Sequence, residues 1–363
     1  MPSFRNKLWD GKIRLFNVRS NELPAGLIDH LETFATQRGY NIGVEKTKYG
    51  YPDSVSKNEK VNPQNVMEFI HSLDLPFAIR DYQFDAVCRG LERKRAILLS
   101  PTGSGKSLII YVLVKYWLQL LTQGMRYPNG GRVLVIVPTT GLVEQMYGDF
   151  KSYGQSEAGM HRIYSGKDKA FDTAICISTW QSIYKLGPPW FEQFGMVIGD
   201  ECHGFKSKSL TTIMNKCTEA AYRFGTTGTL DGTQTHELVL QGLFGRVHKV
   251  TTTKALQDND TLAKLEINRL ILKHKEYDSF GKRSYQDEID YIVRHEKRNQ
   301  FIRNLALDQT GNTLVLFQFV EKHGKILFDL IEDKACEGRK IFFVSGATET
   351  SDREAIRKIT EKQ

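Results

Sequence analysis

The residues with the clearest chemistry stand in a glycine-rich segment, Ser100 to Ser107, which reads SPTGSGKS between a short apolar run and a long helix-like stretch. Gly103 and Gly105 let the backbone turn with its N–H groups directed at an anion, and the following helix adds the positive end of its dipole. Lys106 can then reach the outer phosphates of a nucleotide, and the Ser107 hydroxyl can bind Mg²⁺. The segment predicts a phosphate-binding loop that consists of Thr102, Gly103, Ser104, Gly105, Lys106 and Ser107.

The match to this loop is partial, because the strict pattern has a glycine where this chain has Ser100. An ordinary Gly/Ser turn ahead of a buried helix is the alternative interpretation. A second motif, further along the chain, argues against that alternative.

Two adjacent carboxylates, Asp200 and Glu201, directly follow the apolar segment 196–199. A carboxylate at the end of a buried strand, beside a phosphate loop, can hold Mg²⁺ through water, and its neighbour can orient the attacking water. Alone, such a pair is more often a solvated strand end. Together with the loop, it predicts that Asp200 holds Mg²⁺ and that Glu201 orients the water that attacks a bound nucleotide.

With Thr227, Gly228 and Thr229, these segments resemble motifs I, II and III of superfamily 2 helicases and translocases, in which residues 200–203 (DECH) form a DExH-type box. The order and spacing of the motifs agree with the family throughout. The resemblance implies two RecA-like domains and an ATP-driven motor. It also implies that His203 and residues 227–229 couple hydrolysis to domain movement.

Other segments extend the resemblance. Arg80 to Gln83 (RDYQ) is similar to the family element whose glutamine reads adenine, which places Arg80 and Gln83 in the nucleotide site. Residues 137–146 and 177–182 resemble motifs Ia and Ib, which touch the nucleic-acid backbone. The candidate contacts there are Thr139, Thr140 and Thr179, although caps of helices that follow strands are an equally good interpretation. Residues 8–15 and 190–203 are more closely similar to bacteriophage recombination helicases of the UvsW type.

Composition narrows the class of protein. A chain of 363 residues with 40% apolar residues can bury more than one core, and a net charge of +8 suits a phosphate-rich partner without proving one. The five cysteines form no CxxC pair, so neither a disulfide framework nor a zinc site is indicated. No apolar stretch is long enough for a membrane span, and we expect a soluble, cytoplasmic protein, located in the host cell if it is phage-encoded.

Three domains are expected. Residues 1–72 form a small α+β accessory module, with a strand at 12–17, a helix within 27–40 that places Leu27, Leu31 and Phe34 on one face, and a linker at 46–62. Basic and aromatic residues of this module, among them Arg14 and Trp9, can grip DNA; the alternative is that Trp9 is core and the charges are a solvated face.

Residues 73–250 form the RecA-like ATP-binding domain, an α/β fold with a parallel sheet. Its strands are expected at 132–138, 174–179, 196–201 and 223–229, so that each motif lies at the carboxyl end of a strand. Residues 251–363 are a partial second RecA-like domain with buried strands at 313–318 and 340–346. The resemblance leads us to expect that the rest of that domain, including the arginine finger, is missing from the chain.

The sequence therefore predicts an ATP- and Mg²⁺-dependent DNA helicase that remodels branched recombination, repair or replication intermediates. The expected partners are DNA junctions and RNA–DNA hybrids, with no membrane, and the expected state is a monomer. One alternative is the double-stranded DNA translocase subunit of a restriction system, which would need a nuclease partner. Another is a nucleic-acid-binding protein with an incomplete ATPase.

Overall fold

The computed structural model describes residues 10, 12–45, 60–125, 127, 130–273 and 284–361, and it divides the chain into two compact units, 1–264 and 265–363. This division does not follow the expected boundaries at 72 and 250. Residues beyond 250 still pack on the first unit, where Leu256 is buried and the Leu262 side chain lies against the phosphate loop at Gly103. The three-domain division stays a prediction.

The described part of the first unit contains one sheet of seven parallel strands in the order β3-β4-β2-β5-β6-β1-β7. The strands are β1 (Arg95–Leu99), β2 (Arg132–Val137), β3 (Met160–Ile163), β4 (Ile175–Thr179), β5 (Phe194–Asp200), β6 (Tyr222–Thr227) and β7 (Val247–Lys249). The strands expected at 132–138, 174–179, 196–201 and 223–229 are confirmed, whereas β3 and β7 were not predicted. Because all strands are parallel, their carboxyl ends meet at one edge of the sheet, and that edge carries the motifs.

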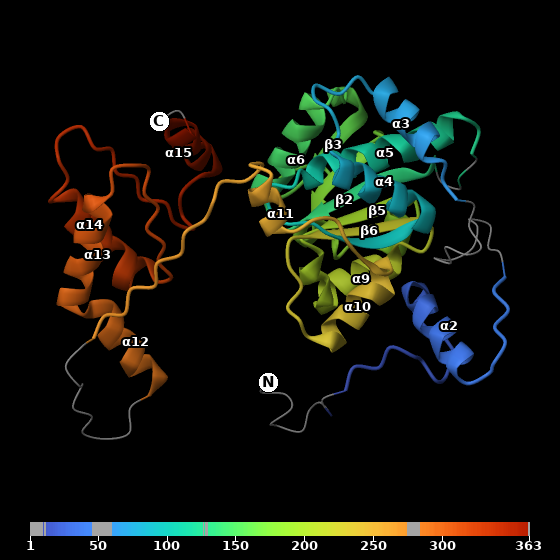
Figure 1. Ribbon diagram of the computed structural model, residues 1–363, viewed down its shortest axis with the longest axis horizontal. Helices are drawn as coiled ribbons and strands as arrows, with labels where there is room; N and C mark the ends of the chain where they lie inside the picture. Colours follow the sequence, from blue (N-terminus) through green and yellow to red (C-terminus); the bar gives the residue numbers. More distant parts are fainter. Residues whose placement is uncertain are drawn as a thin grey trace. The chain divides into compact units, whose positions relative to one another are not determined.

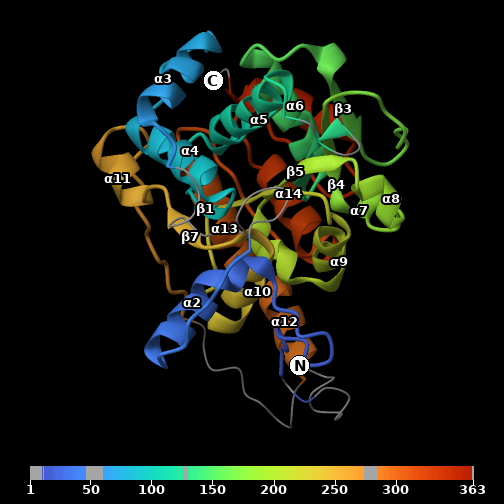
Figure 2. The ribbon, with the colours of Figure 1, turned by 90° about the vertical axis from the view of Figure 1, so that its right-hand side faces the viewer.

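Helices cover both faces of this sheet, as Figures 1 and 2 show for α3–α6 on one side and α9 and α10 on the other. Along β2, Val133, Val135 and Val137 belong to one buried core, and Leu134 and Ile136 belong to the other. This alternation is the period of two that a strand between two helical layers requires. The helices and 3₁₀ segments after residue 60 are α3 (Pro63–Ser72), α4 (Asp81–Arg93), α5 (Lys106–Thr122), α6 (Thr140–Ser152), η3 (Glu157–Gly159), α7 (Trp180–Ile183), α8 (Pro188–Phe191), η4 (Cys202–Lys206), α9 (Lys208–Lys216), α10 (Gln234–Phe244) and α11 (Thr253–Asp258).

The N-terminal segment of this unit differs from expectation. The predicted strand at 12–17 is wrong, since these residues join no sheet and only Asn17 pairs with Glu22 in an isolated bridge. Segment η1 (Ala25–Leu27) and helix α2 (Ile28–Gln37) do form. Leu27 is buried, but Leu31 and Phe34 are 43% and 49% exposed, because the segment packs on the unit through η1 instead of through the apolar face of α2. Trp9 and most of the predicted linker, residues 46–59, lie outside the described residues.

The second unit contains α12 (Tyr285–Arg294), α13 (Glu296–Asp308), the π-helical turn η5 (Val320–Gly324), α14 (Lys325–Glu332) and α15 (Thr350–Glu361). The strands expected at 313–318 and 340–346 are wrong, since residues 284–361 contain no assigned strand. The rings of Phe317 and Phe343 stack at 5.3 Å, so the two segments touch, yet Leu314 and Leu316 are more than 80% exposed. An apolar run becomes a strand only where a neighbouring strand offers its backbone groups.

Within the part of the chain that the structure describes, no helix combines the length and the apolar character needed to cross a membrane.

Candidate active site

The phosphate loop connects β1 to α5 at the carboxyl edge of the sheet. Gly103 and Gly105 have φ angles of +80° and +77°, a left-handed conformation that residues other than glycine rarely adopt. Ser100 occupies the position where the strict motif has glycine, and its buried hydroxyl hydrogen-bonds the Ser104 hydroxyl at 2.6 Å. The Ser104 hydroxyl also lies 2.6 Å from the Pro101 carbonyl oxygen. The departure from the motif is therefore built into the internal bonding of the loop.

Gln83 fastens the start of α4 to this loop. Its side chain is only 3% exposed; Oε1 accepts the Arg80 backbone N–H, and Nε2 donates to the Ser104 carbonyl, both at 2.9 Å. The Tyr82 hydroxyl donates to the same carbonyl at 3.1 Å, and Arg80 donates to that hydroxyl at 2.9 Å. The motif indicated Gln83 and Arg80; Tyr82 belongs to the same four-residue element, but no role was predicted for it.

Asp200 ends β5 and is 7% exposed. Burial raises the pKa of its carboxyl, and a hydrogen bond from the Thr226 hydroxyl at 2.7 Å opposes that rise. Glu201 follows with a φ of +48°, an uncommon conformation for a residue other than glycine. The Glu201 side chain reaches the phosphate loop, where Lys106 Nζ lies 3.5 Å from its Oε1. The expected pairing of loop and carboxylate is thus present in the fold.

The second carboxylate oxygen of Glu201 faces the end of β6. His203 Nδ1 lies 3.3 Å from this oxygen and 2.9 Å from the Thr227 hydroxyl. The Thr227 hydroxyl also lies 3.0 Å from the Thr229 carbonyl and 3.4 Å from Glu201 Oε2. Because a threonine hydroxyl has one proton, it can donate to only one of these acceptors at a time. The next residue, Gly228, lies against the start of the phosphate loop, near the Ser100 carbonyl.

The site offers few ligands for a metal ion. In the described residues, no group of three or more His, Cys, Asp or Glu side chains could hold one. The two predicted ligands, Asp200 and Ser107, fit Mg²⁺ at a nucleotide, because such an ion takes one or two protein ligands and completes its shell with phosphates and water. The Ser107 hydroxyl, predicted to be one such ligand, lies 2.9 Å from the Tyr153 hydroxyl. None of the sequence motifs includes Tyr153.

The candidate nucleic-acid residues lie in different settings. Thr139 is exposed and caps α6 by accepting the Leu142 N–H at 3.3 Å, and Thr140 is the first residue of that helix. Thr179, at the end of β4, is 4% exposed and its hydroxyl lies 2.9 Å from that of Ser182. Both threonine segments share the edge of the sheet that carries the phosphate loop. Arg14 is exposed and pairs with Asp10 at 2.5 Å.

Comparison with known proteins agrees with this geometry. A family model described as "Type III restriction enzyme, res subunit" matches residues 76–232, and one described as "DNA helicase UvsW, N-terminal" matches residues 1–45. The ATP-dependent DNA helicase uvsW of Enterobacteria phage T4 is 33% identical over 378 residues, which cover 99% of this chain and 71% of the relative. The DNA 3'-5' translocase XPB2 of Sulfurisphaera tokodaii is 30% identical over 42% of this chain and 30% of its own.

Solved structures give the same result. A crystal structure of the UvsW helicase from bacteriophage T4 superposes with a TM-score of 0.58 at 33% identity, over 68% of this chain and 86% of the other. A second T4 UvsW structure covers 99% of this chain and 70% of its own, also with a TM-score of 0.58, at 29% identity. A phosphate loop, a DExH box and a Thr-Gly-Thr segment on one edge of a parallel sheet define the ATP-hydrolysing helicases of superfamily 2. Within that class, the chain belongs to the family of the DNA helicase UvsW.

Proposed function

We propose that this protein uses ATP hydrolysis to remodel branched DNA, including junctions of single and double strands and RNA–DNA hybrids. The proposal of an ATP-driven motor rests on the chain of contacts from Lys106 through Glu201 to His203 and Thr227. It joins the nucleotide loop to the ends of β5 and β6, so a change at the phosphates reaches both strands.

In this proposal each residue of the site has one task. The loop amides and Lys106 bind the phosphates, Gln83 selects adenine, and Glu201 orients the attacking water. Asp200 and Ser107 hold Mg²⁺, which when bound neutralises charge that develops on the transferred phosphoryl group. The buried hydrogen bond from Thr226 supports this role, because it favours the charged form of Asp200.

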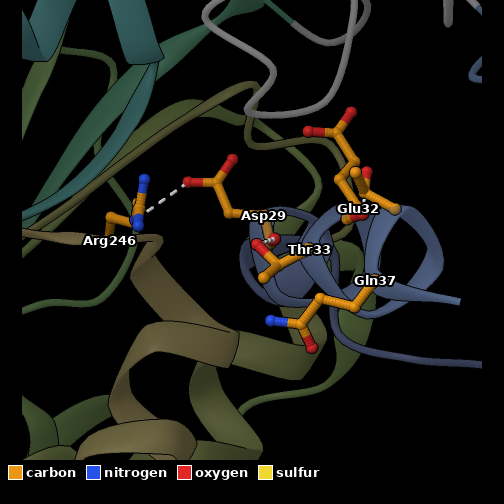
Figure 3. Close-up of a pocket in the computed structure, with 6 residues that line it drawn as sticks. Asp29, Glu32, Thr33, Gln37 and Arg246 are labelled. Carbon is orange, nitrogen blue, oxygen red and sulfur yellow. Dashed lines mark hydrogen bonds and ion pairs between the residues drawn. The ribbon is translucent and has the colours of Figure 1, made fainter.

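Two separate regions of the first unit support a branched DNA substrate. Thr139 and Thr140 lie at the carboxyl edge of the sheet, directly after β2, which pairs with the strand that ends in Asp200. The N-terminal segment is fixed at the opposite edge, because its Asp29 pairs with Arg93 and Arg246, which precede β1 and β7. Figure 3 shows the 3.1 Å pair of Asp29 and Arg246 in the shallow pocket beside α2. Contacts at both edges suit a substrate with more than one arm.

The N-terminal segment has the side chains for such contacts. Arg14 and Arg19 are exposed, and Phe16 and Val18 beside them are 47% and 77% exposed. Exposed basic groups bind phosphates, and an exposed aromatic ring can stack on an unpaired base.

Binding of forked DNA at several salt concentrations tests the substrate assignment. We expect binding that is independent of sequence, falls steeply with salt, and weakens several-fold in a variant with Arg14→Glu and Trp9→Ala. Affinity for ATP should not change, and Lys254→Glu, an equal charge reversal on α11, should have little effect. Fork binding like that of the unchanged protein, or unfolding of the variant seen by circular dichroism, would contradict the DNA role of the segment.

A further inference from the structure

The Ser107 hydroxyl has a protein partner that no motif accounts for. It lies 2.9 Å from the Tyr153 hydroxyl, and it also interacts with the carboxylate of Asp149. Both partners belong to the end of α6, where Tyr153 is the residue that caps the helix. In the proposed function, the same serine oxygen is a ligand of Mg²⁺.

Tyr153 is held in place from two sides. Its ring makes edge-on contacts with Tyr111, at 5.4 Å, and with Phe77, at 5.6 Å, and only 8% of the residue is exposed. A buried tyrosine hydroxyl needs a hydrogen-bond partner, and the structure gives it Ser107. The contact is therefore set by the packing of α5 against α6, and it does not depend on the loop alone.

We propose that Tyr153 is a positioning residue that competes with Mg²⁺ for the Ser107 hydroxyl. In this proposal Ser107 gives its own proton to Asp149 and accepts the Tyr153 hydroxyl proton on a lone pair of its oxygen, so Mg²⁺ can bind that lone pair only in exchange for the hydrogen bond from Tyr153. The proposal rests on the assignment of Ser107 in the proposed function, and it adds residues of α6 to the control of that ligand.

Helix α6 also gives this exchange a route to nucleic acid. The helix has 13 residues, or about 20 Å at 1.5 Å per residue, and it begins at Thr140, beside the candidate DNA contact Thr139. A strand bound at its first turn can shift the helix as a rigid element and move Tyr153 at its other end. DNA binding then favours the release of Ser107.

The test measures equilibrium binding of ATP to the full chain with Mg²⁺ and with EDTA. Removing one hydroxyl contact changes an equilibrium by about two- to tenfold, so Tyr153→Phe should tighten Mg²⁺-dependent binding by that factor and leave binding in EDTA unchanged. Tyr111→Phe is the matched control, because it removes a hydroxyl from the same aromatic cluster while the Ser107 contact remains. Saturating forked DNA should tighten ATP binding less in Tyr153→Phe than in the unchanged protein.

A double-mutant cycle separates this proposal from the one on which it rests. In a Ser107→Ala background, Tyr153→Phe should have no effect. If Ser107→Ala leaves the Mg²⁺ dependence of ATP binding intact, the metal assignment of the proposed function fails. If Ser107→Ala abolishes that dependence but Tyr153→Phe changes binding equally with Mg²⁺ and with EDTA, Tyr153 has a structural role only and the competition proposal is overturned.

Discussion

Replacement of Gln83 by alanine removes the link between α4 and the phosphate loop. Two hydrogen bonds are lost, one from the Arg80 N–H and one to the Ser104 carbonyl. The Ser104 carbonyl then keeps only the hydrogen bond from the Tyr82 hydroxyl. At about 0.5–1.5 kcal/mol for each bond, the loss is about 1–3 kcal/mol. If this free energy is what holds the loop in its nucleotide-binding conformation, its loss lowers ATP affinity about five- to 150-fold.

Binding of ATP and GTP to Gln83→Ala tests both roles of this side chain, with the exposed Gln64→Ala on α3 as the control. We expect weaker binding of both nucleotides, because the loop loses support, and a larger loss for ATP, because adenine loses its reader. Equal losses for ATP and GTP would refute the adenine role and leave the support role standing. Affinities unchanged for both nucleotides would refute the whole account of Gln83.

Two further predictions concern other parts of the first unit. A Cβ at Gly26 would lie 2.0 Å from the Gln241 carbonyl oxygen. Gly26→Ala should therefore lower the free energy of unfolding, measured by chemical denaturation, by about 1–3 kcal/mol. Gly43→Ala is the control and should change this free energy little, because the space around Gly43 is open. Thr226→Val removes a hydrogen bond that lowers the pKa of Asp200. That pKa should rise further, and the acid limb of the pH–rate profile for ATP hydrolysis should move to higher pH.

The sequence predicted the central strands because their apolar runs end in motifs that only the edge of a parallel sheet can bring together. It did not predict β3 and β7, which are short and read MHRI and VHK. His161, Arg162 and His248 interrupt the apolar runs by which the other strands were predicted. Both strands lie at the edges of the sheet, where strands are often short and carry charged side chains. Conversely, the apolar runs at 313–318 and 340–346 predicted strands that the second unit does not form.

The residues of the candidate site that belong to sequence motifs were predicted, and those brought to the site by packing were not. Lys106 and Glu201 belong to motifs whose chemistry shows in the residue types, and the fold brings them to 3.5 Å. Tyr153 belongs to no motif, and its contact with Ser107 depends on how α5 and α6 pack across 46 residues of sequence. Contacts of this kind arise from tertiary packing, which neither spacing nor composition encodes directly.

The most direct test of the central claim is ATP hydrolysis by Glu201→Gln in the full-length protein, with and without forked DNA. Glutamine keeps the size of the side chain but cannot act as a base, so Mg·ATP binding should persist while turnover falls by about a hundredfold or more. The exposed Glu68→Gln on α3 controls for the loss of one charge and should hydrolyse ATP at the normal rate. Steady-state hydrolysis by Glu201→Gln at the rate of the unchanged protein would contradict the assignment of the catalytic carboxylate.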